Sequence, residues 1–397
     1  MNSKDRILAA MNHDRPDRVP VMCQLALGHY FLNCDHRPSD IWFDSDVLAQ
    51  SLVELMQTYG FDGILVNLPG RPPDWKDRLQ SYEQKDHSEQ LCWKSGLETV
   101  VPSDDNPYTY QNEQQPLLRA DSNHVDVNDP RTYRINGYLW NIWHAPELWD
   151  IDSQANLSDP AVYPSWFTQG VRKVQQLASD FSIHCEVFSP FTHLLELFGY
   201  EQALMALIEK PKTCHQLLTV FTQHMLAQIT VYASCKPDAI LISSAFAGAG
   251  FISRPMYSEF VLPYEKELCQ AISSHGCKSY VHTCGAIGDR LDLMIQTEVD
   301  GIDTLDPPPL GTVNLEEAKA EYGDQIFFKG NLDAVNEMLN ADETTFEQAV
   351  KNRLSIGMPG SGYILSSACS IAPHVRPQRL HRLVELAKEF GQYSETL

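Results

Sequence analysis

The feature that most constrains the fold is a repeated alternation of short apolar runs with amphipathic segments of helix length. The runs predict eight buried strands, at 19–25, 63–67, 182–188, 239–244, 278–285, 301–306, 325–331 and 362–368. Strands that alternate with helices indicate a parallel sheet, and eight of them predict a closed (β/α)8 TIM barrel. An open, doubly wound sheet is the alternative, but no glycine-rich phosphate loop follows an early strand.

Helical periodicity fills most of the intervals between these runs. Helices are predicted at 3–12 with Ser3 as its cap, 44–59, from Asp159-Pro160 to about 179, 191–198, 200–209, 211–234, 255–275, 287–295, 314–321, 343–355 and 377–390. The rhythm fails only between about 70 and 158, which is rich in Pro, Asp, Asn and aromatic residues.

We interpret 70–158 as an insertion after the second strand of a single barrel domain, 1–397, serving as a lid or as an oligomer contact such as that of a homodimer. Its aromatic residues are predicted to form a small core more readily than a substrate cage. Apolar runs at 91–93 and 98–101 predict a hairpin within it.

The formal net charge is −22, with 52 acidic against 30 basic residues. Binding to nucleic acid requires clustered Lys and Arg, so this composition disfavours a nucleic-acid partner. No apolar run approaches the length of a membrane span, and the N-terminus has no apolar segment typical of a signal peptide. We therefore expect a cytoplasmic protein whose ten cysteines are reduced.

The candidate chemistry begins with His282 and Cys284 at the end of the fifth predicted strand. Residues i and i+2 of a strand point to the same face, so the imidazole and the thiol converge. Cys369 follows the eighth predicted strand and would reach the same end of the barrel. One histidine and two cysteines suit Zn²⁺ with a fourth position left open for a substrate. An incidental His-x-Cys pair is the alternative.

Five other polar residues end or follow predicted strands. Glu186 is a candidate base or fourth zinc ligand, and Asp303 a candidate catalytic residue, with a purely structural role as the alternative for each. Candidate substrate-binding residues are His29, Asn331 and Asp333, although the last two also match an ordinary helix cap.

Several stretches resemble the uroporphyrinogen decarboxylase superfamily, and the resemblance covers most of the chain outside 70–158. They are 5–20, 251–266, His282-Thr-Cys-Gly285 and Lys329-Gly-Asn-Leu-Asp333. The resemblance implies the (β/α)8 barrel. True decarboxylases of this superfamily hold tetrapyrrole carboxylates with an arginine-rich N-terminal segment, whereas this chain has Gln24-Leu-Ala-Leu-Gly-His-Tyr30 there.

The cobamide-dependent methyltransferase branch carries a His-x-Cys…Cys zinc site, which His282, Cys284 and Cys369 match residue by residue. The segment 367–373 around Cys369 is also similar to that branch, whereas Ser243, Ser244 and Ala245 stand where acidic residues are common. This likeness implies methyl transfer between a corrinoid (cobalamin), on a partner protein or free, and a small thiol- or oxygen-containing substrate. Decarboxylation of a porphyrinogen or another acid, a zinc-dependent hydrolase or lyase, and a non-catalytic scaffold are the alternatives.

Overall fold

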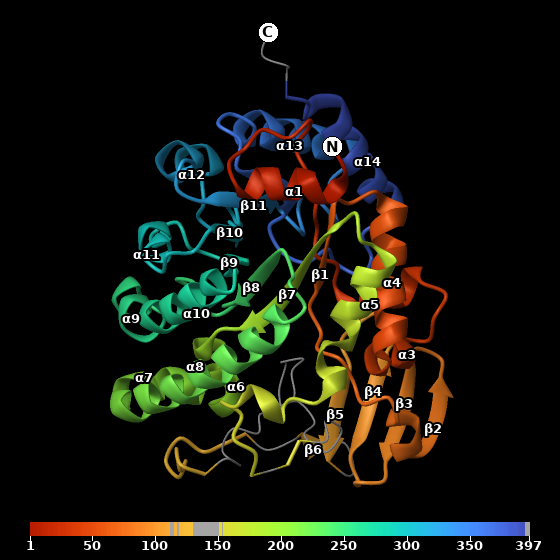
Figure 1. Ribbon diagram of the computed structural model, residues 1–397, viewed down its shortest axis with the longest axis vertical. Helices are drawn as coiled ribbons and strands as arrows, with labels where there is room; N and C mark the ends of the chain where they lie inside the picture. The colour runs from red at the N-terminus through yellow and green to blue at the C-terminus, as the bar shows by residue number, and fades with distance from the viewer. Residues whose placement is uncertain (112–114, 117–118, 130–150, 153, 394–397) are drawn as a thin grey trace.

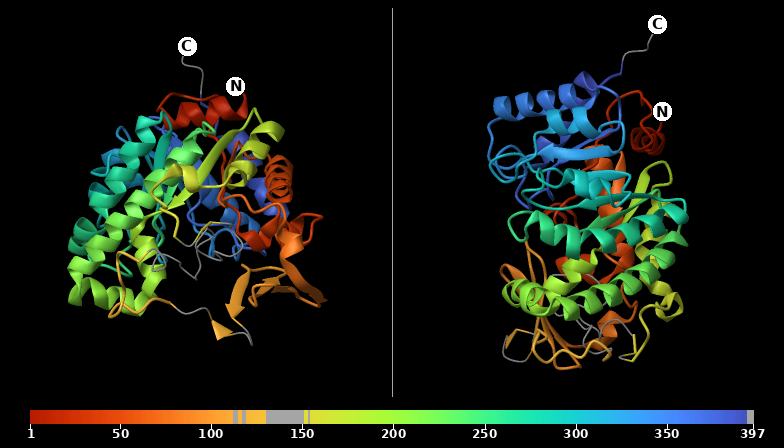
Figure 2. Two further views of the ribbon diagram at one scale, coloured as in Figure 1. Left: turned by 60° about the horizontal axis from the view of Figure 1, so that its bottom comes forward. Right: turned by 90° about the vertical axis from the view of Figure 1, so that its left-hand side faces the viewer.

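The computed structural model describes residues 1–111, 115–116, 119–129, 151–152 and 154–393. A curled sheet of seven parallel strands forms its centre, and helices cover the outer side (Figures 1 and 2). In spatial order the strands are β1 (Gly63–Val66), β7 (Ser182–Phe188), β8 (Ala239–Ser243), β9 (Lys278–His282), β10 (Gly301–Thr304), β11 (Phe327–Leu332) and β12 (Tyr363–Ser367). The spatial order follows the chain order, which confirms the predicted alternating α/β architecture.

The first predicted strand, 19–25, does not form a regular strand. Val21 and Leu25 make only isolated parallel bridges, the first to Leu365 of β12. On the other side, the N–H of Asp62, just before β1, donates to the Val21 carbonyl. Pro20 has no N–H to donate to a ladder, which helps to explain why the pairing stays discontinuous. This extended segment therefore hydrogen-bonds beside both outer strands without completing a ladder with either.

The helices follow the predicted intervals closely, with additional short helices before β1. They are α1 (Ser3–Met11), α2 (Leu27–Asn33), α3 (Pro38–Phe43), α4 (Ser45–Tyr59), α5 (Gln169–Leu177), α6 (Pro190–Phe198), α7 (Tyr200–Glu209), α8 (Pro211–Ala233), α9 (Arg254–Phe260), α10 (Leu262–Ser274), α11 (Leu291–Ile295), α12 (Leu315–Tyr322), α13 (Glu343–Gly357) and α14 (Pro377–Phe390). Two predicted helices are interrupted beside prolines. The interval 255–275 divides at Val261, before Pro263, and the interval from Asp159 begins as two 3-10 turns around Pro164.

Helix α1 lies across the amino ends of the strands, where the N-terminus is also found (Figure 1). Its predicted cap is wrong, because Asn2 accepts the Asp5 N–H while the Ser3 hydroxyl donates to Asp62. The apolar face of α1 packs into the interior of the curled sheet. The residues that share this interior core are Ile7, Ala10, Met11, Met22, Leu65, Ala239, Leu241, Tyr280, Phe327 and Ile364. These side chains thus fill the interior of the sheet at its amino end.

A second, antiparallel sheet lies within the predicted insertion (Figure 1). Its strands are β2 (Leu79–Lys85), β3 (Ser88–Trp93), β4 (Glu98–Pro102), β5 (Tyr108–Gln111) and β6 (Gln115–Pro116). The pairing of β3 with β4 confirms the predicted hairpin. Trp75 and Trp93 both pack on Phe43 of α3, as a small core requires. Much of the remaining insertion, including Trp140, Trp143 and Trp149, lies outside the described residues.

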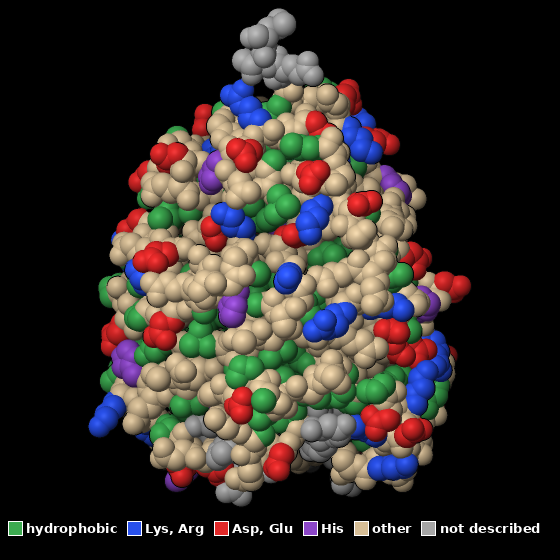
Figure 3. Space-filling view, viewed as in Figure 1, with side chains coloured by type: hydrophobic (Ala, Val, Ile, Leu, Met, Phe, Trp, Pro, Cys, Tyr) green, Lys and Arg blue, Asp and Glu red, His purple; other side chains and the backbone are tan. Residues whose placement is uncertain are grey.

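Among the described residues, no helix is long and apolar enough to cross a membrane. Lys and Arg side chains stand singly among acidic ones on the face seen in Figure 3. All ten cysteines are free, as expected for reduced thiols.

Candidate metal centre and cavity

A row of four polar residues crosses neighbouring strands near their carboxyl ends. Ser243 of β8 pairs in register with His282 of β9, His282 with Asp303 of β10, and Asp303 with Lys329 of β11. Paired residues of a parallel sheet point to the same face. His282 lies two residues after Tyr280, which belongs to the interior core, so both side chains point inward, and the rest of the row points inward with them. The carboxyl ends of barrel strands are where active sites lie.

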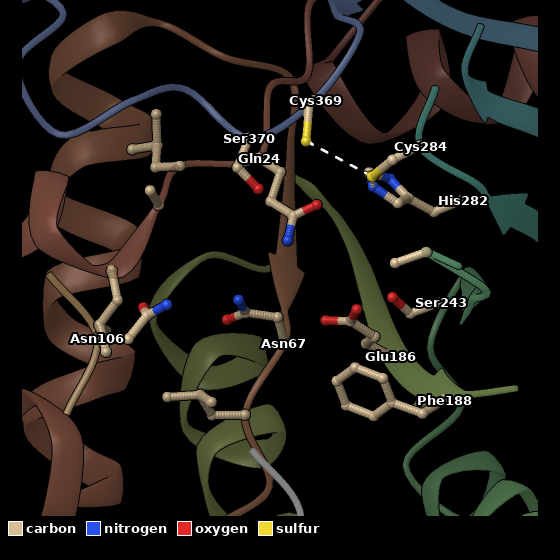
Figure 4. A pocket seen from close by; sticks show the side chains of 15 residues that line it. Gln24, Asn67, Asn106, Glu186, Phe188, Ser243, His282, Cys284, Cys369 and Ser370 are labelled. Atoms are coloured by element: carbon tan, nitrogen blue, oxygen red, sulfur yellow. Dashed lines mark hydrogen bonds between the residues drawn. The ribbon is translucent and has the colours of Figure 1, made fainter. Parts of the chain in front are cut away.

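The three predicted metal ligands converge at this end (Figure 4). The Cys284 sulfur lies 3.5 Å from His282 Nε2 and 3.9 Å from the Cys369 sulfur. In a tetrahedral zinc site the Zn–S distance is about 2.3 Å and the Zn–N distance about 2.0 Å. This geometry places a sulfur ligand about 3.5 Å from a nitrogen ligand and about 3.8 Å from a second sulfur. All three ligand atoms lie within 4.8 Å of one another. The trio thus has both the donor set and the spacing of a zinc site.

Local sequence explains how two of the ligands are presented. His282 ends β9, and Gly285, whose φ of +78° suits glycine, turns the chain directly after Cys284. The Gly285 N–H donates to the Asp306 carboxylate at 2.6 Å, which anchors the turn. A hydrogen bond between the two thiols lowers the pKa of Cys369 well below the usual thiol range and raises that of Cys284. Thiolate is the form that binds metal.

Asp303 contacts a ligand and does not line the cavity. Its carboxylate lies 3.2 Å from His282 Nδ1 and accepts the Lys329 ammonium at 3.0 Å, with both of these charged side chains 2% exposed. Burial would raise the pKa of Asp303, but Lys329 and His282 together lower it to about 2. The carboxylate lies at Nδ1, so Nε2 is the ring nitrogen directed at the two sulfurs and placed to ligate a metal ion. This placement suits Asp303 to orient the His282 ring.

Glu186 of β7 lines the cavity, as a catalytic or ligating carboxylate would. The residue is 7% exposed, and burial raises the pKa of its carboxyl to about 7. Its Oε2 atom has no hydrogen-bond partner among the described residues. It stands outside the trio whose ligand atoms are mutually close.

The three predicted substrate-binding residues lie outside this cavity lining. His29 is fully buried on α2 and contacts the Tyr59 hydroxyl at 2.8 Å and the Pro373 carbonyl at 3.1 Å. The Asn331 amide donates to the Leu305 carbonyl and accepts from Arg353. Asp333 accepts the N–H groups of the turn that follows, in the manner of a helix cap, although this turn does not continue into a helix.

The cavity has a volume of about 180 Å³. Its polar lining includes residues that sequence reasoning missed, namely Gln24, Asn67, Asn106, Ser243 and Ser370, alongside Phe188 and other apolar side chains. Most of them end a strand or follow one, and that position was the available signal. Asn106 lies between β4 and β5, so the second sheet contributes part of the wall. None of the described lining residues is a Lys or an Arg.

Comparison with known proteins agrees with this arrangement. A family model described as uroporphyrinogen decarboxylase (URO-D) matches residues 147–390, more than half of the chain. The chain belongs to the uroporphyrinogen decarboxylase family. A methyltransferase from Methanosarcina mazei has the same fold, with a TM-score of 0.68 at 15% identity, and the match covers 98% of this chain and 99% of that one.

Curated relatives within this family carry two kinds of name. A uroporphyrinogen decarboxylase of Chlorobium phaeobacteroides is 31% identical over 209 residues, which cover 50% of this chain and 56% of that protein. The Methylcobamide:CoM methyltransferase MtbA of Methanosarcina acetivorans is 28% identical over 153 residues, 38% of this chain and 42% of the relative. The chain thus spans about half the length of the curated relatives it matches. Membership identifies an enzyme family that contains both decarboxylases and methyltransferases.

Proposed function

We propose that this protein is a zinc-dependent methyltransferase that moves a methyl group between a corrinoid and a small thiol- or oxygen-containing substrate. The observation that carries the proposal is the convergence of His282, Cys284 and Cys369 at the cavity, in zinc geometry. The family's methyltransferase relatives support the same conclusion. No Asp-x-His-x-x-Gly corrinoid motif occurs in the sequence, so the corrinoid would come from a partner protein or from solution.

The residues of the chain have distinct tasks in this proposal. His282 and the two cysteines would hold the ion, and Asp303 keeps His282 in the tautomer that ligation requires. Two thiolates and a neutral imidazole bring the centre close to zero net charge. Zinc bound there would lower the pKa of a thiol, alcohol or water ligand and so supply a nucleophile at neutral pH. In thiol methylation the S–H proton is released, and a sulfur–carbon bond forms as the cobalt–carbon bond breaks, leaving its electron pair on cobalt.

Decarboxylation of a porphyrinogen is the second candidate, because curated relatives carry that name. Its substrate bears several carboxylates, which need cationic partners when they leave water. The described lining offers no Lys or Arg, and Glu186 would face those carboxylates. This charge pattern favours the methyltransferase.

Metal analysis joined to a methyl-transfer assay tests the proposal. We expect about one zinc per purified chain and loss of the methylcobalamin absorption spectrum on addition of small thiols. Cys284→Ala and Cys369→Ala should each abolish both readouts. Cys92→Ala, on β3 and outside the lining of this cavity, should leave both unchanged.

Other results would redirect the assignment. A zinc-free protein that decarboxylates a porphyrinogen would refute the methyltransferase proposal. Zinc binding with hydrolysis or elimination, and no methyl transfer, would instead identify a zinc hydrolase or lyase on the same scaffold. Neither metal nor turnover would leave the scaffold interpretation.

A further inference from the structure

Outside the metal-ligand trio, the described lining of the cavity has an acidic side chain but no Lys or Arg. Apart from the metal-ligand trio, Glu186 is the only ionisable residue in its described lining, and the remaining polar groups are amides and hydroxyls. The buried cation Lys329 of β11 is already paired with Asp303 at 3.0 Å. An anionic group entering beyond the metal centre would lose its hydration without gaining a Lys or Arg partner, and it would face the Glu186 carboxylate.

Two buried acceptor atoms also lack donors within the described part of the chain. They are Glu186 Oε2 and Gln24 Oε1, each with almost no contact with solvent. Buried polar atoms in native proteins are nearly always hydrogen-bonded, so an unpartnered pair at a cavity indicates a ligand that supplies the donors. Figure 4 shows both side chains pointing into the space beneath Cys284 and Cys369. A carboxylate has acceptor atoms only, which makes an N–H-rich cation its best partner.

We propose that the cavity selects a substrate bearing a small cationic amino group, which donates to Glu186 and Gln24, and that it rejects carboxylate, sulfonate and phosphate analogues. This inference rests on the proposed function, since the same molecule would carry the thiol or oxygen that is methylated. Glu186 is then the residue that determines specificity, and the substrate class is an amino-thiol or amino-alcohol.

A panel of thiols that share a two-carbon spacer and differ in the group at its end tests this selectivity. Cysteamine carries an ammonium group, 2-mercaptoethanol a hydroxyl and 3-mercaptopropionate a carboxylate. With methylcobalamin as donor, we expect kcat/KM for cysteamine to exceed that for 2-mercaptoethanol by about tenfold or more, the value of one charge-assisted hydrogen bond. The carboxylate thiol should be the poorest. Calorimetric binding of the three thiols to the zinc-loaded protein should follow the same order.

Glu186→Gln keeps the side-chain shape and removes the charge. We expect it to abolish the preference for cysteamine over 2-mercaptoethanol, both as a ratio of kcat/KM values and as a ratio of calorimetric affinities. Glu201→Gln, exposed on α7, should leave both ratios unchanged. Because the wild-type panel already tests the selectivity, the proposal stays falsifiable if the Glu186 variant does not fold.

The outcomes separate the two proposals. Preference for the carboxylate thiol, equal use of all three, or an unchanged ratio in Glu186→Gln would overturn the cationic selectivity while methyl transfer stands. Glu186-dependent binding of cysteamine without methyl transfer would support the selectivity and refute the methyltransferase. Neither turnover nor a binding preference would overturn both.

Discussion

The interaction between Asp303 and His282 decides how the candidate metal centre is presented. Asp303 lies beside His282 in strand register and accepts from Nδ1, while Lys329 neutralises it from the next strand. A histidine held in this way exposes Nε2 with little freedom to rotate. The carboxylate would therefore act on a bound metal ion through the imidazole.

Replacing Asp303 with Asn should lower zinc affinity by about 10–100-fold, the usual effect of losing a residue that orients a ligand. The measurement is competition with a chromophoric chelator. The variant also leaves the Lys329 ammonium buried without its partner, which should cost about 3–5 kcal/mol of unfolding free energy. The double variant Asp303→Asn/Lys329→Met should recover stability without recovering affinity. Unchanged affinity in both variants would contradict the positioning role.

Residue patterns predicted the convergence of His282, Cys284 and Cys369 better than they predicted the surroundings of the trio. The i, i+2 rule for strands placed His282 and Cys284 together, and the glycine turn kept Cys284 in line. The sequence could not show that Asn331 and Asp333, also at a strand end, turn away to bond the backbone and Arg353. Strand ends lie at the active-site end of a barrel, but the loop that follows decides which side chains reach the cavity.

At the scale of elements, Asp62 joins three parts of the amino end. Its buried carboxylate accepts from Arg6 of α1 at 2.6 Å, and from Arg18 and the Val21 N–H at 2.9 Å each. The residue itself immediately precedes β1. These hydrogen bonds hold the segment 19–25 next to β1, where no regular strand ladder forms. The bond to Arg6 fixes α1 at the amino end of the sheet.

Asp62→Asn should therefore destabilise the protein by about 3–5 kcal/mol, because two largely buried guanidinium groups lose their shared counter-charge. Urea unfolding followed by circular dichroism would measure the change. Asp324→Asn, exposed in the turn after α12, serves as the matched control and should shift stability by less than about 0.5 kcal/mol. A similar effect of the two substitutions would show that Asp62 does not hold these elements together.

Element boundaries were predictable where one periodicity ran without interruption, as in α8 and α14. The boundaries were not predictable where a proline or tertiary hydrogen bonds compete with the periodicity. Pro263 divides the interval 255–275, although its apolar pattern continues through both halves. The run 19–25 has the composition of a strand, but its backbone bonds are distributed between β12 and the segment before β1.

At the scale of the whole molecule, the candidate metal centre joins parts of the chain that only folding brings together. Cys284 and Cys369 are 85 positions apart, at the ends of β9 and β12. The intervening strands β10 and β11 separate them in the sheet, and its curvature is what lets their sulfurs approach. The unfolded chain has no such site, so binding of a metal there would be coupled to stability.

Removal of the metal should therefore lower the unfolding temperature measurably. Zinc at about 1,000 times its Kd would add about 4 kcal/mol to the folded state, which for a chain of this length corresponds to a fall of about 5 °C on chelation. Differential scanning calorimetry before chelation, after it and after zinc is restored would measure the shift. The Cys284→Ala/Cys369→Ala variant should melt at one temperature under all three conditions. If the wild-type protein behaved in the same way, the trio would not be a metal site.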